Sequence, residues 1–448
     1  MRGIKNFMAM RRLTTQLSLL RPGDSFFSLH KHFAKAKQEL FRAISLGAKN
    51  IYSYHDFTHR QHKKIECSPE QKYNLLKSFY GEILFKKLRN FRFIGVTGTN
   101  GKTSVALLLQ QTLSKSGLKF GSLGTLGLKD PNSLSIASFN LTTPDIIDFY
   151  WSAFYLQDHN YQGLITEVSS HALCQRRVLG ISFEAVIATS VSCDEHRDYH
   201  KTSHHYLSSK AKLFNDYKST HKILHSGNLL VPFIKNHQGI RFAFEKPPRQ
   251  IKSLVEVFHK SHFELIEQYL QVSGLWPSCS FKNIITYSSI PGRFNLISCA
   301  GERIGVVDYA HTPMALDYIL RIAKNFYQDR QLWVIFGCGG QRDRWKRPQM
   351  LEKANFYADH VIVTEDNNRQ ENFSSIIDDI FSLTQKPSSK SRTHVIQNRD
   401  DAIAYAFRQS KKRSVIIVAG KGPELYHQKR FNLSNNSDLK QVKSYEAF

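Results

Sequence analysis

The stretch "GVTGTNGKTS", Gly95 to Ser104, decides the fold expected for this chain. It follows the apolar run "FIGV" and leads into "KTSVALLLQQTL", which has the composition of a buried helix. Gly98 and Gly101 permit tight turns, so that backbone N–H groups at the helix start can cradle a phosphate with help from the helix dipole. The usual pattern, G-x-x-x-x-G-K-[ST], places its first glycine where Val96 stands here. The stretch therefore predicts a strand, a shortened phosphate loop and a helix.

The side chains of this loop suit a nucleoside triphosphate. Lys102 can reach the β and γ phosphates, and the Thr103 hydroxyl can bind magnesium. An ordinary glycine-rich turn is the alternative, but it does not require strand, loop, Lys-Thr pair and helix in this order. The expected ATP-binding residues of the loop are Gly98, Thr99, Asn100, Gly101, Lys102, Thr103 and Ser104.

Composition narrows the class of partner. The chain has 448 residues and a formal net charge of +25, from 62 Lys and Arg against 37 Asp and Glu. This balance favours an anionic partner, either nucleic acid, an acidic membrane face or a small molecule with several phosphates and carboxylates. A general lysine bias explains the charge equally well, because the basic residues are spread along the chain. No apolar run approaches the ~20 residues of a membrane span, so no membrane insertion is expected.

The cysteines and the N-terminal segment indicate the cellular compartment in which the protein is expected. The six cysteines form no C-x-x-C and no zinc spacing, which is typical of reduced cytosolic thiols. Residues 1–23 hold five basic residues and no acidic one, without the apolar core of a secretory signal. A cytoplasmic protein is expected, and the alternative is an organelle-targeted one if residues 1–23 are a transit segment.

Short apolar runs alternate with helical stretches along most of the chain. Such alternation predicts an α/β protein with mostly parallel sheets covered on both faces. We expect a small N-terminal α/β domain, a central doubly wound ATPase domain and a C-terminal Rossmann-like domain, at residues 1–90, 91–288 and 289–448. Ligands bind beyond the carboxyl ends of such strands. Residues 86–92 are expected to form a basic connector between the first two domains.

Further motifs follow the loop in a fixed order. They are "LTTPD" (141–145), "TEVSSHALCQRRV" (166–178), "EHRDYH" (195–200), "YLSSKAKLF", "GRFN", "VDYAHTP", "FGCGGQRDRWKRP", "EDNNRQEN" and "AGKGPE". With the loop G-x-x-G-K-T, this series resembles the superfamily of Mur ligases and folylpolyglutamate synthetases. It is most similar to the branch that adds the third amino acid to UDP-N-acetylmuramoyl dipeptide. The motifs span residues 93 to 424.

The resemblance implies an ADP-forming amide ligase of peptidoglycan precursor synthesis, and hence a role in cell-wall formation, cell shape and division. ATP would phosphorylate a carboxylate, and an amine would then attack the acyl phosphate. Such a reaction needs anions to be neutralised and aligned, which suits Mg²⁺ with oxygen ligands. The implied partners are the UDP-linked dipeptide and diaminopimelate or lysine, with no nucleic acid, and the implied oligomeric state is a monomer.

The resemblance also assigns the catalytic and metal-binding residues. Lys102 would hold phosphate, while Thr103, Glu167 and His196 would bind magnesium. Lys210, fourteen residues after His196, matches a lysine that is carbamylated in these ligases. A CO₂-derived carbamate turns its amine into a carboxylate-like group that can bind a second metal ion or position the substrate. Lys212 competes for this role, but the Y-x-x-x-K-x-x-x-F spacing selects Lys210.

Substrate contacts follow from the same motifs. The UDP-muramoyl dipeptide would contact hydroxyls and an arginine, which suit sugar, phosphate and carboxylate groups: Thr142, Thr143, Ser169, Gln175 and Arg177. The nucleotide would also contact Asn295 at adenine, Asp308 at ribose and, nearby, His311. The incoming amino acid would contact Arg342, Asp366, Asn367, Asn368, Arg369, Gly420 and Glu424.

Several positions depart from the family pattern. The family's D-N-P-R is Asp366-Asn367-Asn368-Arg369 here, which keeps the arginine expected to hold the distal carboxylate of meso-diaminopimelate. Diaminopimelate is therefore expected over lysine, although losing the proline frees the loop. Pro423, Gln341 and Trp345 also replace family residues. A uridine-site D-S-R is absent, and Gln16-Leu17-Ser18 stands in its place.

Three other functions compete with this one. A folylpolyglutamate synthetase shares the superfamily, but "EVSSHAL", "DYAHTP" and "GCGG" favour the muramoyl branch. A basic nucleic-acid-binding ATPase predicts basic patches with aromatics, and only Trp345 between Arg344 and Lys346 fits. A degenerate, inactive scaffold is disfavoured by the retention of Lys102, Glu167, His196 and Lys210.

Overall fold

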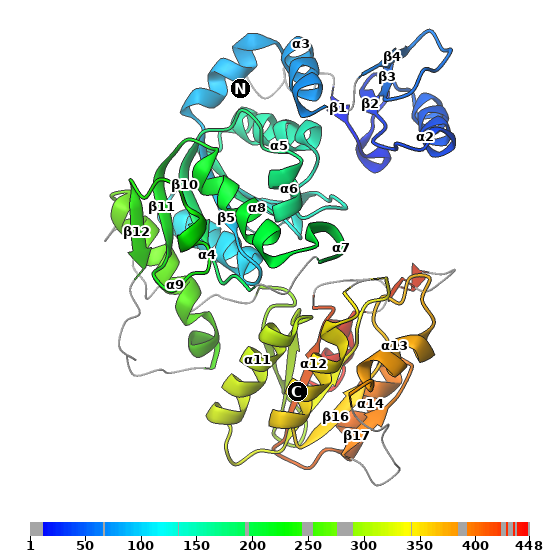
Figure 1. Cartoon of the computed structure of the whole chain (residues 1–448), viewed down its shortest axis with the longest axis vertical. Coiled ribbons are helices and arrows are strands. Elements are labelled where there is room, and N and C mark those ends of the chain that lie inside the picture. Colours follow the sequence, from blue (N-terminus) through cyan, green and yellow to red (C-terminus); the bar gives the residue numbers. More distant parts are fainter. Residues whose placement is uncertain are drawn as a thin grey trace. The chain divides into compact units, whose positions relative to one another are not determined.

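Three sheets of four or more strands, with the helices that connect them, organise the computed structural model (Figure 1). The structure describes residues 12–65, 68–132, 134–192, 197–243, 254–275, 290–341, 343–383, 392–422, 427–428, 433–434 and 437–446. The chain divides into two compact units, unit 1 (1–191, 207–245 and 262–284) and unit 2 (192–206, 246–261 and 285–448). Unit 1 holds a four-stranded and an eight-stranded sheet, and unit 2 a six-stranded sheet. The expected α/β class is confirmed.

The small sheet of unit 1 is parallel throughout. Its order is β1 (Leu13–Thr14), β2 (Ser25–Phe27), β3 (Asn50–Ser53) and β4 (His62–Lys64). The apolar face of α2 (Phe33–Ser45) packs on it through Leu40 and Ala43, which join Phe26 and Ile51 in one buried cluster. The next helix, α3 (Pro69–Lys87), is interrupted at Gly81, where φ is +75°.

The basic connector expected over residues 86–92 is not an open linker. Lys86 and Lys87 end α3, Leu88–Asn90 form one 3₁₀ turn, and Arg92 already begins β5. The two lysines suit this place, because the helix dipole favours cations in the last turn of a helix.

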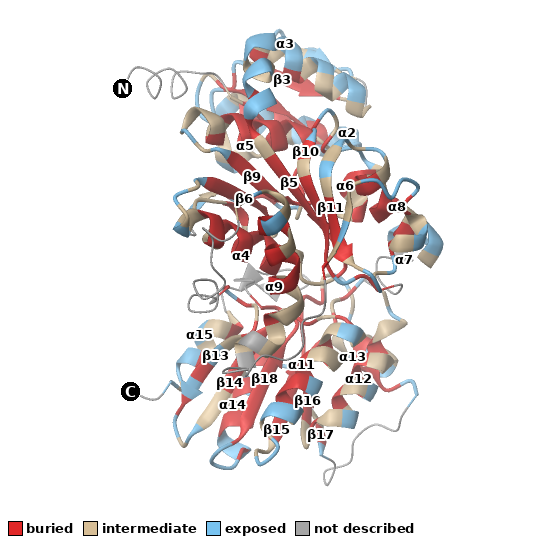
Figure 2. Ribbon diagram, turned by 90° about the vertical axis from the view of Figure 1, so that its left-hand side faces the viewer, coloured by how far each residue is buried: buried red, intermediate tan, exposed pale blue. Residues whose placement is uncertain are grey.

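In the eight-stranded sheet, the strand β5 that leads into the phosphate loop has neighbouring strands on both sides. Its order is β12-β11-β10-β5-β9-β6-β7-β8; β7 pairs antiparallel with both β6 and β8, and the other pairs are parallel. The strands are β5 (Arg92–Thr97), β6 (Phe120–Gly124), β7 (Gly127–Lys129), β8 (Ser135–Ala137), β9 (Gly163–Glu167), β10 (Phe183–Ala188), β11 (Ser219–His225) and β12 (Ile240–Ala243). The helices along this segment are α4 (Lys102–Lys115), α5 (Ile146–Asp158), α6 (Ser170–Cys174), α7 (Arg197–His200), α8 (Ser203–Asn215) and α9 (Leu254–Val272). The central strands are buried almost throughout (Figure 2).

Unit 2 has a sheet with two separate apolar cores. The sheet order is β13 (Asn295–Cys299), β14 (Arg303–Asp308), β18 (Val415–Ala419), β15 (Leu332–Phe336), β16 (His360–Val363) and β17 (Thr393–Val395). Alternate residues face opposite cores: Val334 packs with α11 (Pro313–Phe326) and α12 (Lys346–Tyr357), and Ile335 with α14 (Arg399–Gln409). The remaining elements are α13 (Phe373–Ile380), the β19 (His427–Gln428) and β20 (Leu433–Ser434) ribbon and α15 (Asp438–Lys443). Helices therefore cover both faces, as expected for buried parallel strands.

Polar residues gather at the carboxyl ends of the parallel strands. In unit 1, the loop of Gly98 follows β5 and Glu167 ends β9. In unit 2, Asp308 ends β14 and Asp366 comes shortly after β16. These ends are where open α/β sheets bind ligands. Among the described residues, no helix has the length and apolar character needed to cross a membrane.

Candidate active site

The phosphate loop between β5 and α4 has the geometry that the glycines predicted. Gly98 and Gly101 have φ of +146° and +87°, which disfavour any side chain. A Cβ on Gly98 would lie 1.9 Å from Thr189 Oγ1. The Lys102 ammonium donates to the carbonyl oxygens of Gly98 and Thr99, at 2.9 and 3.0 Å. Asn100 Nδ2 is buried, and no described residue accepts a hydrogen bond from it. This unsatisfied donor beside a glycine cradle fits an anionic ligand such as phosphate.

Glu167, at the end of β9, is joined to the start of α4. Thr103 Oγ1 donates to Glu167 Oε1 at 2.9 Å, and Thr125 N donates to the same oxygen at 2.9 Å. A Cβ on Gly124 would lie 2.0 Å from Glu167 Oε1, so only glycine leaves room for the carboxylate. A hydroxyl beside a buried carboxylate is a hard oxygen set, and therefore fits Mg²⁺.

Lys210 is brought to the phosphate loop by α8. Its side chain is buried, with 2% exposure, and Nζ donates to the Gly98 carbonyl oxygen at 2.7 Å. Gly98 and Lys210 are 112 residues apart in sequence. Lys212, two residues further along α8, is only partly buried. The structure thus brings Lys210 and Lys102 together at the carbonyl oxygen of Gly98.

The residues expected to bind the dipeptide substrate form one hydrogen-bonded group in unit 1. Thr143 Oγ1 donates to Glu167 O at 2.8 Å and accepts from Ser169 N at 3.0 Å. Arg177 donates to the Thr143 carbonyl oxygen at 2.7 Å and to Gln175 Oε1. Thr142 and Thr125 share a 3.2 Å hydrogen bond. The group is therefore linked through its backbone and hydroxyls to the magnesium candidate Glu167.

Sequence reasoning missed three residues that shape the loop. Thr189 Oγ1 donates to Asn100 O at 2.6 Å, and Ser190 O accepts from Thr99 N at 2.8 Å. Both follow β10, so their position at a strand end was a usable signal. His262 of α9 is the third: a Cβ on Gly101 would lie 2.4 Å from its Nε2. No local pattern points to His262, because it lies 161 positions after Gly101 in the sequence and the two meet only in the folded chain.

The nucleotide residues expected in unit 2 lie around the end of β14. Asp308 Oδ2 accepts from Phe294 N and Oδ1 from Ala310 N, both at 2.8 Å. Burial raises the pKa of Asp308 to about 6, against the opposing effects of Arg293 and these two N–H groups. Asn295 uses its amide to close the turn before β13, accepting from Gly292 N and donating to Ile290 O. His311 Nδ1 bonds to the Tyr309 carbonyl oxygen at 2.7 Å.

Two loops of unit 2 are joined where the incoming amino acid was expected. Arg369 donates to the Gly340 carbonyl oxygen at 2.7 Å, and Gly340 N donates to the Asn367 carbonyl oxygen at 3.0 Å. A Cβ on Gly340 would lie 2.0 Å from the Asn368 carbonyl oxygen, so this close approach requires glycine. Asp366 comes near Gly420, whose Cβ would be 3.1 Å from Asp366 Oδ2. Asp366, Asn367, Asn368, Arg369 and Gly420 are thus neighbours in space.

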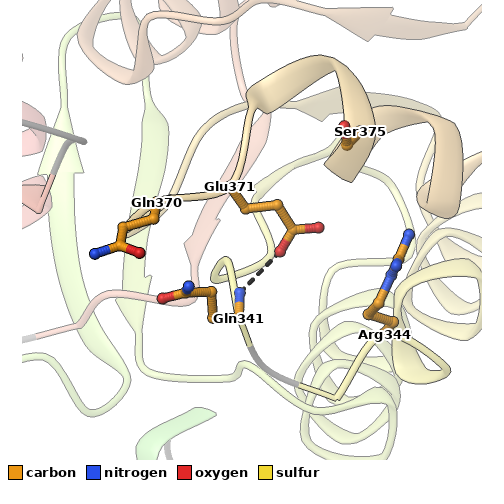
Figure 3. Close-up of a pocket in the computed structure, with 5 residues that line it drawn as sticks. All are labelled: Gln341, Arg344, Gln370, Glu371 and Ser375. Carbon is orange, nitrogen blue, oxygen red and sulfur yellow. Dashed lines mark hydrogen bonds between the residues drawn. The ribbon is translucent and has the colours of Figure 1, made fainter.

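The pocket in unit 2 lies beside these loops but does not include the expected residues. It has a volume of about 440 Å³ and is lined by Gln341, Arg344, Gln370, Glu371 and Ser375 (Figure 3). Its wall is fixed by Gln341 N, which donates to Glu371 Oε2 at 2.8 Å. Three expected site residues, His196, Arg342 and Glu424, fall outside the described part of the chain.

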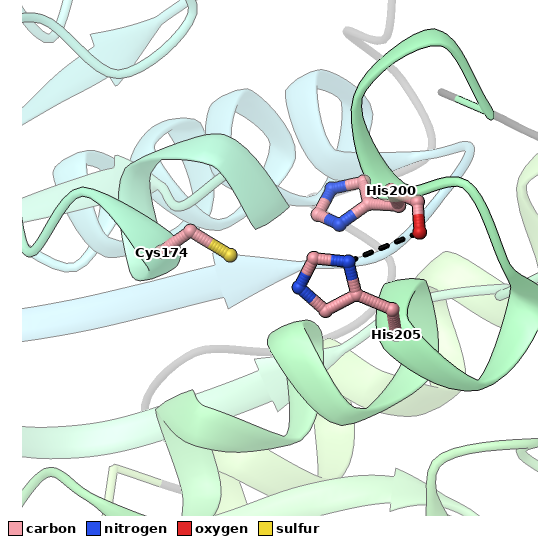
Figure 4. Close-up of side chains that lie close together, drawn as sticks. All are labelled: Cys174, His200 and His205. Atoms are coloured by element: carbon pink, nitrogen blue, oxygen red, sulfur yellow. Dashed lines mark hydrogen bonds between the residues drawn. The ribbon is translucent and has the colours of Figure 1, made fainter.

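The segment after His196 is described from residue 197. His205 Nδ1 lies 3.0 Å from the His200 carbonyl oxygen (Figure 4). The His200 ring also stands edge-on to Tyr206, with centroids 5.3 Å apart. These contacts fix the start of α8, the helix that carries Lys210.

The structure also describes Gln16-Leu17-Ser18, which stand where the uridine-site D-S-R motif was expected. Gln16 precedes a short 3₁₀ turn, Leu17–Leu19, and its backbone N–H donates to Thr14 Oγ1 at 3.1 Å. Thr14 Oγ1 and Thr15 N donate to the buried Asp148 carboxylate, at 2.9 and 3.1 Å. These residues attach β1 to α5.

The site combines a strand, a shortened glycine loop, a Lys-Thr pair and a buried carboxylate. Together these features define a P-loop enzyme that depends on a nucleotide. Two family models match the chain: the Mur ligase middle domain at residues 96–297 and the Mur ligase, glutamate ligase domain at residues 292–422. The chain belongs to the Mur ligase family, and it is an ATP-dependent, ADP-forming ligase.

Several relatives of this chain share the same enzyme name. The chain is 32% identical to the UDP-N-acetylmuramoyl-L-alanyl-D-glutamate--2,6-diaminopimelate ligase of Aquifex aeolicus, over 78% of this chain and 76% of that one. It is 29% identical to the ligase of the same name from Buchnera aphidicola, over 95% and 92%. A solved structure of a ligase with that name has a TM-score of 0.57 at 25% identity, covering 97% and 94%.

Solved structures of other family branches share the fold. A MurF ligase from Thermotoga maritima in complex with ADP has a TM-score of 0.61 at 14% identity, covering 92% of this chain and 94% of that one. A folylpolyglutamate synthase from Mycobacterium tuberculosis complexed with ADP has 0.63 at 14% identity, covering 80% and 92%. At these identities the likeness supports the fold alone. The relatives named above, together with the motif series, favour the muramoyl branch over the folate branch.

Proposed function

We propose that this ligase adds meso-diaminopimelate to UDP-N-acetylmuramoyl-L-alanyl-D-glutamate, in the synthesis of peptidoglycan precursors. The observation that carries the proposal is the convergence of Lys102, Lys210 and the Thr103–Glu167 pair on one glycine loop. The substrate assignment comes from relatives of that name which cover most of the chain. We further propose that the enzyme works as a cytoplasmic monomer on small-molecule substrates and so serves cell-wall growth, cell shape and division.

The proposed reaction has two steps. A carboxylate oxygen of the dipeptide attacks the γ-phosphorus of ATP, the bond to the β-phosphate oxygen breaks, and ADP leaves. The amine of diaminopimelate then attacks the acyl carbon, loses a proton and displaces phosphate, leaving an amide. Both steps bring anions together, so cationic and N–H groups at the loop lower the barrier by neutralising and aligning them.

Residues of unit 1 are assigned to the phosphates and the metal. Lys102 and the loop N–H groups hold the phosphate chain, and the buried Asn100 amide adds a donor. Thr103 and Glu167 would hold Mg²⁺, with His196 assigned by the motif alone. Bound there, the ion would neutralise phosphate charge and orient the transferred group.

Lys210 is proposed to carry a carbamate. Its Nζ lies at the loop, buried, where a carboxylate-like group would face the phosphates and metal rather than solvent. Carbamylation joins CO₂ to the neutral amine with loss of one proton. An unmodified ammonium would serve instead as a second phosphate-holding cation, and the rescue test in the Discussion separates these roles.

Thr142, Thr143, Ser169, Gln175 and Arg177 are proposed to contact the dipeptide substrate. Asn295, Asp308 and His311 are proposed to contact the nucleoside. The segment Asp366–Arg369 and the neighbouring Gly420, with Arg342 and Glu424, are proposed to hold the incoming amino acid. Arg369 uses one of its N–H groups on the Gly340 carbonyl oxygen, and its guanidinium has further N–H groups for a carboxylate.

The deciding experiment follows ADP release and product mass together. Purified protein is given ATP, Mg²⁺ and UDP-muramoyl dipeptide with meso-diaminopimelate, L-lysine or no amino acid, and in parallel a folate with glutamate. We expect ADP release and a new amide only with the dipeptide and diaminopimelate. Ligation of glutamate to the folate, without any dipeptide product, would overturn the proposal in favour of the folate branch.

A further inference from the structure

The buried arginine at the start of α14 reaches two strand ends at once. Arg399 has 2% exposure and lies on α14, outside every motif that assigned a site residue. Its NH2 group donates to the Ala419 carbonyl oxygen at 2.8 Å, and NH1 to the Glu365 carbonyl oxygen at 3.4 Å. Ala419 ends β18, and Glu365 follows β16.

These two strands are not neighbours. The sheet order places β15 between β18 and β16, so no ladder joins the two directly and they are coupled only through their ladders with β15. Arg399 spans the intervening strand on the α14 side. A guanidinium suits this task, because it is a rigid plane with donors directed outward in a fork.

The residues directly after these contacts are those assigned to the incoming amino acid. Asp366 follows Glu365, and Gly420 follows Ala419. The two positions approach each other closely: a Cβ on Gly420 would lie 3.1 Å from Asp366 Oδ2. The spacing of the two strand ends therefore sets the distance between the two loops.

The arginine is itself held by the C-terminal helix. Asp438, with 3% exposure in the first turn of α15, accepts from Arg399 Nε at 2.7 Å and from NH2 at 2.8 Å. The position of α15 is fixed by fully buried Val442 and by Tyr445, whose ring stacks on Phe407 with centroids 4.2 Å apart. Asp438 thus holds the guanidinium at Nε and NH2, while NH1 and NH2 reach the two carbonyl oxygens.

We propose that Arg399 and Asp438 are a positioning pair, which holds the loops of Asp366 and Gly420 at the spacing needed to bind the incoming amino acid. The inference rests on the proposed assignment of these loops to that substrate. Neither residue touches the amino acid; both act through the backbone of Glu365 and Ala419.

The test compares Arg399→Lys with Arg413→Lys. Lysine keeps the charge and can bond Asp438, but a single ammonium cannot replace the fork across β15. Arg413 is the matched control, because it also pairs with an aspartate, Asp329, at 2.8 Å, but with side chains 58% and 63% exposed. We expect Arg399→Lys to raise the KM for diaminopimelate about tenfold, the effect of about one lost hydrogen bond. We expect kcat at saturating amino acid and the KM for ATP to change less than twofold, and Arg413→Lys to match the wild type.

A second variant guards against loss of folding. Asp438→Asn leaves the carbonyl contacts of Arg399 available and should shift the same KM in the same direction. Thermal unfolding of each variant is recorded alongside. An unchanged KM for diaminopimelate in folded Arg399→Lys overturns the inference, and so does equal impairment of both KM values. If both variants are unfolded at the assay temperature, the pair serves stability alone and the inference is wrong. Failure of the wild type to ligate diaminopimelate overturns the proposed function instead.

Discussion

The Lys210 ammonium lies 2.7 Å from the carbonyl oxygen of Gly98, which joins α8 to the phosphate loop inside unit 1. Lys102 donates to the same carbonyl oxygen at 2.9 Å. Two lysines from helices distant in sequence thus meet at one glycine. The two cations repel each other, and the proposed carbamate on Lys210 would relieve this repulsion.

Removing Lys210 tests whether its modified form is needed. We expect Lys210→Ala to lose at least a hundredfold in kcat, and acetate or formate to restore part of it by replacing the missing oxygens. Lys212→Ala, two residues further along α8, is the control and should retain near wild-type kcat. Full activity of Lys210→Ala in carbonate-free buffer would rule the carbamate out. Loss without any rescue by a carboxylic acid would favour a role for the ammonium itself.

Lys102→Ala should abolish ligation. The side chain is the mobile cation of the loop, and its loss leaves the phosphate chain without its charge partner, which typically costs several kcal/mol in the transition state. The measurement is dipeptide-dependent ADP release at saturating ATP, with thermal unfolding as the check on folding. Ligation at the parent rate would show that the loop does not hold the reacting phosphates.

Glu167→Gln should raise the Mg²⁺ concentration needed for half-maximal activity, by about tenfold if one charged ligand is lost. The amide oxygen of glutamine can still accept hydrogen bonds from Thr103 and Thr125. Both contacts, at 2.9 Å in the wild type, can therefore still form. Titration of Mg²⁺ at fixed ATP separates this effect from a loss of folding. An unchanged Mg²⁺ requirement with lowered kcat would remove Glu167 from the metal site.

Arg369→Ala should reduce discrimination between the two amino acids. A guanidinium can hold the distal carboxylate of meso-diaminopimelate, and lysine has no such group. We expect kcat/KM for diaminopimelate to fall at least tenfold while that for L-lysine stays within a few-fold. Arg408→Ala, an exposed arginine on α14, is the control. Equal or better use of lysine by the wild type would contradict the specificity.

Asp308 predicts a pH-dependent contribution to stability. Its pKa is raised by burial from 3.8 to about 6, so the folded form keeps the proton that the unfolded chain has already lost between these values. The contribution of Asp308 to stability is therefore largest below about pH 4 and falls as the pH rises towards 6, by about 3 kcal/mol for a shift of two units. The free energy of unfolding of the wild type relative to Asp308→Asn should fall by this amount across the window. A difference that is flat with pH would show that Asp308 ionises normally.

The sequence alone predicted the strands, the phosphate loop and most of the residues that lie together within one motif. Apolar runs such as "FIGV" and "SVIIV" gave β5 and β18, because strands buried on both faces must be apolar along their whole length. Gly98 and Gly101 predicted the loop, because only glycine adopts its backbone angles without strain. The sequence did not reveal that residues 86–92 include the end of α3 and the start of β5, because charge does not distinguish a helix end from a linker.

Only the tertiary structure decided which distant residues meet. Thr189 and His262 approach the glycine loop, and Arg399 ties two non-adjacent strand ends to Asp438, although none of these stands in a motif with its partners. The physical reason is that local patterns record burial and backbone preference, whereas such contacts depend on strand order and helix packing. Burial and backbone preference follow from each residue and its neighbours in sequence, whereas the long-range contacts form only when the sheets assemble.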